Sequence, residues 1–377
     1  MKRISTIHSH KNIGTGHGLD LQILVTVILL VIFGLIMVYD SSVVQAFKDY
    51  GDNYFYIRQQ LIWVVLGFVA LTFFSFFNYR NLRFFASLML VGSIILLLAV
   101  FIPGLGVSAG GAHRWLNLGF ASIQPAEIVK LTSIIFFATL FTSSSSAYER
   151  RRKILPFGLI VSFVCIVIGI LQKDLGSTIV YFLTALAVYV VADLPLKQFL
   201  KLIPFSIIGF IIFVLTSEYR KNRILAFLDP FSDPQGYSYH ISQVLIALGS
   251  GGFFGLGIGQ SRQKFEYIPE VTTDSIFAIV GEELGFIGAI ILIGLISFLI
   301  FRGLKISENV SDDFGRVLSF GLISWLGIQA IINLGAMVSI IPLTGVPLPF
   351  ISYGGSALMA NLVAIGILLN ISKSADV

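Results

Sequence analysis

Four carboxylates lie close together in a strongly apolar part of the sequence. The segment YIPEVTTDSIFAIVGEELG, residues 267–285, contains Glu270, Asp274, Glu282 and Glu283. Asp274 directly precedes an apolar run, so it could cap a helix, where a carboxylate gains about 0.3–1 kcal/mol. Alternatively, burial could raise its pKa towards neutral pH and make it a general base. The position of Asp274 in the sequence leaves both interpretations open.

Glu282 and Glu283 follow about two helical turns later, roughly 12 Å along the axis at 1.5 Å per residue. Adjacent helical residues point about 100° apart, so at most one of the two can share the helix face of Asp274. Carboxylates within a membrane span are candidate functional residues and are usually paired or face a cavity. We expect one of the pair to make a buried contact between helices. Glu282 and Glu270 remain candidate substrate contacts.

A second polar segment is GGAHRWLNLGFASIQPAEIVKL, residues 110–131. Pro125 suits the first turn of a helix, which places Glu127 and Lys130 on one helix face, where they can pair. Lys130 either neutralises a neighbour or meets an anionic ligand such as a lipid phosphate. Arg114 beside Trp115 suits the membrane interface, either by snorkelling or by phosphate contact.

Three further segments combine polar residues with turn or breaker residues. They are QKDLGS at 172–177, RILAFLDPFSDPQGYSYHISQ at 223–243 and TGVPLPFISYGGSALMAN at 344–361. Asp174 in the first could simply cap the helix that follows. The third predicts irregular backbone, which is tolerated at membrane depth where it lines a cavity. The candidate ligand contacts in the last two segments are Arg223, Gln243, Ser352 and Tyr353.

The elements that must position these residues are membrane-spanning helices. The 377 residues are 56% hydrophobic and 12% charged, with a net charge of +5, whereas soluble domains are about 25% charged. Apolar runs of about 17–25 residues, long enough to cross a bilayer, recur throughout. The sequence predicts an all-α polytopic membrane protein with about ten transmembrane helices. We expect spans at 21–39, 61–77, 84–102, 124–142, 154–171, 177–192, 198–216, 276–301, 317–340 and 354–371.

The charge distribution predicts the orientation of these helices. The basic block YERRRK, residues 148–153, lies in one short loop, and such loops are cytoplasmic. With ten spans, tails 1–20 and 372–377 are then both cytoplasmic and flank a single transmembrane domain, 21–371. A large extracytoplasmic loop, about 217–275, joins helices 7 and 8, and Tyr239–Ala247 within it predicts a short amphipathic helix on the membrane surface. All five polar segments then fall outside or in the outer half, which indicates one polar cavity open to the outer leaflet.

Several site classes find no support in the sequence. Neither a metal-ligand spacing nor a nucleotide-phosphate loop is present, so we expect no protein-held metal site and no certain cofactor. Basic residues interleaved with aromatics are absent from polar segments, which argues against nucleic-acid binding. The lone Cys165 lies in an apolar run and suits a small core residue.

Three segments taken together resemble the SEDS family (shape, elongation, division and sporulation). They are GIGQSRQKFEYIPEVTTDSIFAIVGEELGFIG at 257–288, HRWLNLGFASIQPAEIVKL at 113–131 and PLPFISYGGS at 347–356. The resemblance covers essentially the whole chain. The spacing in GLGIGQSRQKFEYIPE is more similar to the division-type members than to the elongation-type members.

The resemblance implies a peptidoglycan glycosyltransferase of septal cell-wall synthesis in the bacterial cytoplasmic (inner) membrane. Its substrate would be lipid II, an undecaprenyl-pyrophosphate-linked disaccharide peptide. A class B penicillin-binding protein, divisome proteins and membrane lipid would be its partners. Asp274 matches the essential acidic residue of the family and would take the proton from a sugar 4-hydroxyl in an inverting reaction. Lys130, Arg114 and Arg223, with a possible divalent cation (Mg²⁺ or Mn²⁺), would offset the pyrophosphate charge, and Glu127 would orient Lys130.

The chain departs from the usual family pattern at a few positions. The family usually has His-Thr-Asp-Phe at 272–275, a proline at Lys173 and a glutamine at His240, but the aspartate itself is kept. The departures therefore bear on how the environment of the aspartate is adjusted more than on which reaction it carries out. Three other functions stay open: a lipid II flippase, an elongation-type polymerase and a scaffold that recruits the penicillin-binding protein. Another outer-leaflet polyprenyl-sugar enzyme, such as an O-antigen ligase, shares the architecture but lacks these motifs.

Overall fold

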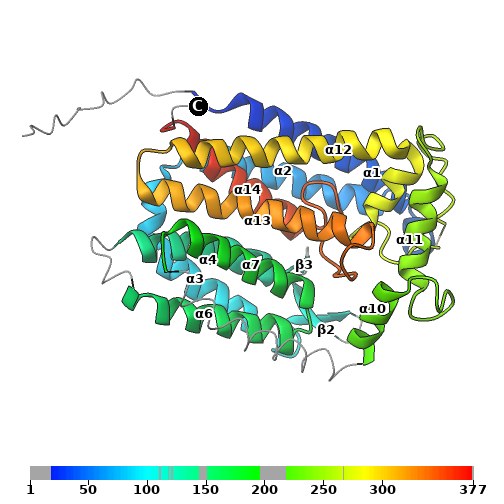
Figure 1. The fold of residues 1–377 in the computed structure, drawn as a ribbon, viewed down its shortest axis with the longest axis horizontal. Helices are drawn as coiled ribbons and strands as arrows, with labels where there is room; N and C mark the ends of the chain where they lie inside the picture. The colour runs from blue at the N-terminus through cyan, green and yellow to red at the C-terminus, as the bar shows by residue number, and fades with distance from the viewer. Residues whose placement is uncertain are drawn as a thin grey trace, which may run out of the picture.

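The computed structural model describes residues 18–109, 112–117, 119, 122–143, 151–195, 218–265 and 267–375 (Figure 1). Within these residues, eight apolar helical stretches are long enough to cross a membrane. They are α1 (Leu21–Tyr50), α2 (Phe55–Phe76), η1 with α3 (Tyr79–Asn81 and Leu82–Ala99), α4 (Pro125–Thr142), α6 with η2 (Ile154–Ile166 and Val167–Leu171), α12 (Ile276–Asn309), α13 (Asp313–Met337) and α14 (Gly355–Ser372). The shorter apolar helix α7 spans Leu175–Val191.

These helices confirm the predicted all-α polytopic membrane fold. Nine of the ten expected spans coincide with apolar helices of the structure. The remaining expected span, 198–216, lies outside the described residues, as do residues 1–17 and 376–377 of the two tails. The count of ten spans and the domain limits therefore stay predictions.

The helices pack side by side along the long axis of the molecule (Figure 1). The central helices α4, α13 and α14 are mostly buried, whereas α2, α3 and α12 expose much of their apolar surface, as expected for helices that face lipid. At one end, Arg302 on α12 forms an ion pair with Asp20 at the start of α1 (2.7 Å), and the Asp20 N–H donates to Ser372. We call this the C-terminal end of the bundle.

Helices α10 (Glu218–Leu228) and α11 (Tyr239–Ser250) lie across the opposite end, which we call the α11 end (Figure 1). The helix predicted at Tyr239–Ala247 is therefore present, and it packs against α12. A small antiparallel sheet, which the sequence did not predict, precedes α4: β1 (Gly106–Ala109), β2 (Ala112–Asn117) and β3 (Ser122–Ile123). Val107 pairs with Trp115 and Leu116 with Ile123. This sheet places Arg114 near the start of α4.

The segment 338–354, between α13 and α14, is irregular, as the sequence predicted, and its second half, 346–352, is mostly buried. Phe350 has a positive φ of 66°, which shows how far the backbone departs from a helix here. Such backbone is stable within a membrane protein only where protein groups satisfy its N–H and C=O groups. The helices around this segment provide those partners, and their polar side chains form the site described next.

Candidate active site

Asp274 lies directly before α12 at the α11 end of the bundle, and its side chain is buried with 4% exposure. Its carboxylate accepts long hydrogen bonds from the hydroxyls of Ser275 (3.4 Å) and Thr273 (3.5 Å). The N-cap of α12 is Ser275, without a side-chain capping bond. The geometry therefore does not favour the interpretation of Asp274 as the cap of this helix.

The surroundings of Asp274 make it a weaker acid than an exposed aspartate. Burial raises the pKa of Asp274 to about 7, and the Glu270 carboxylate adds to this rise. The Arg223 charge and the hydrogen bonds from the backbone and Ser275 oppose it without cancelling it. A carboxylate with a pKa near neutral pH is suited to accept a proton from a substrate hydroxyl.

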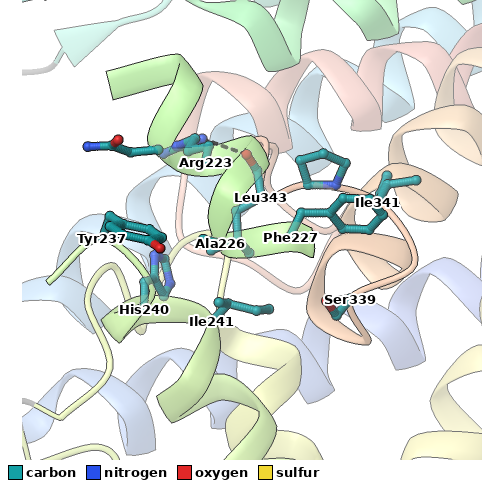
Figure 2. Close-up of a pocket in the computed structure, with 11 residues that line it drawn as sticks. Arg223, Ala226, Phe227, Tyr237, His240, Ile241, Ser339, Ile341 and Leu343 are labelled. Carbon is teal, nitrogen blue, oxygen red and sulfur yellow. Dashed lines mark hydrogen bonds between the residues drawn. The ribbon is translucent and has the colours of Figure 1, made fainter. Parts of the chain in front are cut away.

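A pocket of about 220 Å³ lies between α10, α11 and the 338–354 segment (Figure 2). Asp274 is not one of its lining residues, but the charge of the lining residue Arg223 acts on it. Its polar lining residues are Asn222, Arg223, Tyr237, His240 and Ser339. Arg223 donates to the carbonyl of Leu343 (2.8 Å). The Nε2 atom of His240 lies 2.7 Å from Oγ of Ser275, the neighbour of Asp274. Burial and the Arg223 charge lower the pKa of His240 to about 4, so its imidazole is neutral at neutral pH.

Two amide side chains of α13, Gln329 and Asn333, hold the 338–354 segment against the catalytic candidate. Asn333 donates to the backbone carbonyls of Asp274 (2.7 Å) and Val346 (2.8 Å). Gln329 donates to the carbonyl of Pro347 (3.0 Å). Neither amide was singled out from the sequence. Their signal is an i,i+4 pair of amides in the apolar segment SWLGIQAIINLG, which places both on one helix face.

The predicted pair of Glu127 and Lys130 forms as expected. Lys130 Nζ lies 2.7 Å from Glu127 Oε1 and 3.5 Å from Gln329 Oε1, and it sits over the ring of Trp325. The lysine is 1% exposed. In this conformation its charge is compensated by Glu127, so Lys130 acts on the site through Gln329 and does not face an open cavity.

Arg114 connects the small sheet to the turn before α7. Its guanidinium donates to the carbonyls of Gln172 and Lys173 and lies 4.0 Å from the Asp174 carboxylate. Asp174 caps α7 through the N–H of Ser177 (3.0 Å), so its capping interpretation is confirmed. Arg114 is only partly buried and remains accessible to an anion.

The structure gives Glu282 and Glu283 a different environment from that of Asp274. Glu282 accepts from the Ser261 hydroxyl and from the N–H of Arg262 (3.0 Å). Glu283 accepts from the N–H groups of Gly259 and Ser261 and from Lys264. The sequence assigned a buried structural contact to one of the two residues, but both make such contacts. The substrate role expected for Glu282 is at odds with this geometry, because its oxygens already bind the 259–264 segment.

The other predicted contacts differ in how close they come to Asp274. Glu270 is exposed, accepts from the Thr273 hydroxyl (3.0 Å) and acts on Asp274 through its charge. Ser352 is buried and accepts the N–H of Leu348 at its hydroxyl, which makes it part of the segment's own fold. The Tyr353 N–H donates to the Thr272 carbonyl (2.8 Å) and so connects the 338–354 segment to the turn that carries Asp274. Gln243 lies on α11, half-buried.

The convergence of polar segments predicted from the sequence takes place around the 338–354 segment and the residues next to it. In addition to the contacts above, Ser356 accepts the N–H of Gln124 at the start of α4. Gly176 on α7 approaches so closely that an added Cβ would lie 2.4 Å from the Thr344 carbonyl oxygen. The irregular segment and the start of α14 thus connect the beginnings of α4, α7 and α12. Within the described residues, no group of three or more His, Cys, Asp or Glu side chains is arranged to hold a metal ion.

Comparison with known proteins identifies the family. The profile for FtsW, RodA and SpoVE, described as "Cell cycle protein", matches residues 20–376. The chain belongs to this family. The resemblance inferred from three sequence segments is thereby confirmed.

Similar proteins with assigned names include division-type and sporulation-type members of the FtsW/RodA/SpoVE family. Stage V sporulation protein E of Bacillus subtilis is 40% identical over 354 residues, which cover 94% of this chain and 97% of the relative. The probable peptidoglycan glycosyltransferase FtsW of Geobacter metallireducens is 37% identical over 357 residues, 94% of each chain.

Solved structures of the family share the fold. A chain from a structure described as "Structural coordination of polymerization and crosslinking by a peptidoglycan synthase complex" superposes with a TM-score of 0.76. It is 25% identical, and the match covers 94% of this chain and 97% of that chain. The rod shape determining protein RodA of Thermus thermophilus gives a TM-score of 0.67 at 23% identity, with 95% and 98% covered. The chain is accordingly a multi-pass protein of the cytoplasmic membrane.

Proposed function

We propose that this FtsW/RodA/SpoVE-family chain is a peptidoglycan glycosyltransferase that joins lipid II disaccharides into β1–4 glycan strands. The observation that carries the proposal is Asp274, a buried carboxylate whose pKa is raised to about 7. The Arg223 charge and the contact of His240 with Ser275 connect it to the pocket that these two residues help to line. The similarity to proteins named probable peptidoglycan glycosyltransferase supports the choice of reaction.

In the proposed mechanism, the Asp274 carboxylate removes the proton from the 4-hydroxyl of an incoming lipid II. The oxygen then attacks the anomeric carbon of the growing strand while the bond to undecaprenyl pyrophosphate breaks. Attack from the face opposite the α-linked leaving group inverts the centre and gives a β-link. Asp274 afterwards releases its proton to water. The donor is already activated, so the reaction needs no nucleotide.

The leaving pyrophosphate needs positive charge around it. Arg223, in the pocket wall, and Arg114, beside the α7 turn, are the accessible candidates, whereas Lys130 acts indirectly through its contact with Gln329. We further propose that a divalent cation, Mg²⁺ or Mn²⁺, accompanies the pyrophosphate instead of being held by protein carboxylates. Chelation with EDTA should then lower the polymerisation rate, and either metal should restore it.

We propose that the α11 end faces outwards and that both termini are cytoplasmic, because the YERRRK block follows the positive-inside rule. We also propose a septal location, with a class B penicillin-binding protein and divisome proteins as partners. The similarity to a chain of a peptidoglycan synthase complex supports such a partner. A fluorescent fusion that gathers at mid-cell would favour a division-type role, and one spread along the side wall would favour an elongation-type role.

The test is a polymerisation assay with purified protein and a cognate class B penicillin-binding protein. Wild type, Asp274→Ala and the matched control Asp313→Asn, an exposed carboxylate at the C-terminal end, are incubated with labelled lipid II and resolved on a gel. We expect a product ladder from wild type and control and none from Asp274→Ala. A ladder from all three would exclude Asp274 as the base. The absence of a ladder from all three, together with transport of lipid II across vesicle membranes by Asp274→Asn, would favour the flippase.

A further inference from the structure

Helix α12 is interrupted at Gly285, and a segment about 30 residues earlier in the chain supplies replacement hydrogen bonds. Gly285 has φ 66° and ψ −165°, which interrupts the helical hydrogen bonds on both sides. The segment 251–258, just after α11, replaces them. Leu256 and Gly257 donate to the carbonyls of Glu282 (3.0 Å) and Glu283 (2.9 Å). Phe286 and Ile287 in turn donate to the carbonyls of Gly252 (2.9 Å) and Phe253 (3.2 Å).

This pairing leaves no room for side chains between the two backbones. A Cβ added to Gly255 would lie 2.1 Å from the Glu283 carbonyl oxygen, and one added to Gly285 would lie 2.3 Å from the Gly255 nitrogen. Backbone groups inside a bilayer must be satisfied by protein, because lipid offers no hydrogen bonds. Protein groups therefore satisfy several backbone groups of segment 251–258 and those freed by the break in α12, as backbone within a membrane requires.

The side chains of this region separate into a polar and an apolar side. The Glu282 and Glu283 carboxylates point to the 259–264 segment and bind it, as described above. Phe253 and Phe254, in contrast, are 70% and 83% exposed, and Phe286 on α12 is 57% exposed. The rings of Phe253 and Phe286 contact each other, with their centroids 5.7 Å apart. We call Phe253, Phe254 and Phe286 the phenylalanine edge.

The phenylalanine edge continues the lipid-facing surface of α12. Along this helix towards the C-terminal end, the exposed apolar side chains include Ile287, Ile290, Ile291, Phe298 and Phe301. The ion-paired Arg302 follows them and marks the opposite limit of this apolar surface. The 16 residues from Phe286 to Arg302 correspond to about 24 Å of helix, which is less than the roughly 30 Å thickness of the hydrocarbon core. The distance between the phenylalanine edge and Arg302 is therefore shorter than the thickness of the hydrocarbon core.

We propose that segment 251–258 enters the leaflet at the α11 end of the bundle, with Phe253 and Phe254 in contact with lipid acyl chains. The occupant of this exposed face is lipid because the face is continuous with the lipid-facing side of α12. The chain runs from this segment through 259–264 to Asp274, so the lipid contact fixes the height of Asp274 relative to the leaflet. The insertion itself does not depend on the reaction proposed above.

The test is a measurement of depth in the membrane. In a Cys165→Ala background, single cysteines replace Phe254, Ile291 or Phe231, and each protein is spin-labelled and placed in phosphatidylcholine nanodiscs. Ile291 is 59% exposed on the lipid-facing side of α12 and serves as the lipid control. Phe231 is 56% exposed in the connection between α10 and α11 and serves as the water control. Collisions with oxygen and with a water-soluble nickel chelate are compared at each position.

We expect the ratio of oxygen to nickel collisions at Phe254 to match that at Ile291 and to exceed that at Phe231 several-fold. A ratio equal to that at Phe231 would overturn the proposal and leave the edge for a protein partner. A second measurement does not need the label: Phe254→Trp should lose fluorescence to brominated lipid after subtraction of the wild-type signal. Absence of this quenching in a protein that remains monodisperse would also overturn the proposal.

Discussion

The pKa of Asp274 sets how the polymerisation rate depends on pH. Asp274 must be ionised to act as a base, and its pKa is about 7. About one-tenth of the carboxylate is ionised one pH unit below the pKa and about nine-tenths one unit above it. The rate should therefore rise roughly tenfold between pH 6 and pH 8. An aspartate of ordinary pKa would be fully ionised across this range and would give a flat profile.

Glu270→Gln tests the electrostatic part of this argument. The Glu270 carboxylate raises the pKa of Asp274, so its removal should lower that pKa and shift the rising limb to lower pH. Because Glu270 is exposed, solvent screens its charge, and the interaction is worth only about 0.2–1 kcal/mol. At 1.36 kcal/mol per unit this is about 0.1–0.7 pKa units, or at most about fourfold in rate at pH 6. High salt should reduce the difference.

The same pKa predicts a stability effect with a definite sign. A carboxyl whose pKa is raised on folding stabilises the fold fully below its ordinary pKa of about 4, and this contribution is lost progressively as pH rises from there to about 7. Asp274→Asn should abolish activity yet match the wild type in stability near pH 4 and exceed it at pH 8. The upper limit of the gain is about 4 kcal/mol, from roughly three pKa units at 1.36 kcal/mol each. Thermal unfolding in detergent at both pH values measures it.

Initial rates from pH 5.5 to 9 with saturating lipid II decide the argument, and Asp313→Asn is the control for a remote carboxylate. A wild-type profile that is flat between pH 6 and 8 would refute a base of raised pKa. A rising limb that moves to higher pH in Glu270→Gln would refute the assigned sign of its charge effect. Stability of Asp274→Asn below that of wild type at pH 8 would show that the ionised carboxylate is well compensated.

Two further predictions concern the frame around the site. Gly285→Ala should destabilise the protein by at least about 2 kcal/mol, because it strains a positive φ and forces a Cβ against backbone. Its control Gly294→Ala, in the same helix with open space around it, should be neutral or stabilise by about 0.5–1 kcal/mol; equal melting temperatures of the two variants would contradict the strained break. Glu283→Gln removes one of two carboxylates from the buried Lys264 and should cost about 1–3 kcal/mol. The exposed control Glu308→Gln should change the melting temperature little, and a similar small change in Glu283→Gln would rule out a structural role.

Local patterns in the sequence were sufficient for the helices and for the contacts between close neighbours. Apolar runs located nine of the spans, because a lipid-facing helix needs a continuous apolar length. The Glu127–Lys130 pair followed from a spacing of three residues, which fixes geometry within a single helix turn. The Asp174 cap followed from the position of Asp174 directly before a helix. The irregular segment after α13 was indicated by its prolines and its Gly-Gly pair.

Contacts between distant segments could not be predicted in the same way. Asn333 and Gln329 look like ordinary polar residues of a helix until the 338–354 segment is placed against them. The partners of Glu282 are 19 to 21 residues away, across a turn whose path depends on the break at Gly285. The small sheet before α4 was missed because its strands are short and lie in a segment rich in glycine.

The crowding of carboxylates between 270 and 283 now has a physical account. Glu282 and Glu283 have the same chemistry as Asp274, but their oxygens receive backbone N–H groups, a hydroxyl and an ammonium at hydrogen-bond distance. The hydrogen bonds that the Thr273 and Ser275 hydroxyls donate to the Asp274 side chain are long, and together with a backbone contact they do not cancel the effect of burial. A carboxylate whose oxygens accept several short hydrogen bonds is stable in its ionised form and holds segments of the fold together. A buried carboxylate with few donors is instead stabilised when it takes up a proton. The difference in available donors thus separates two structural residues from the candidate base, within ten residues of one chain.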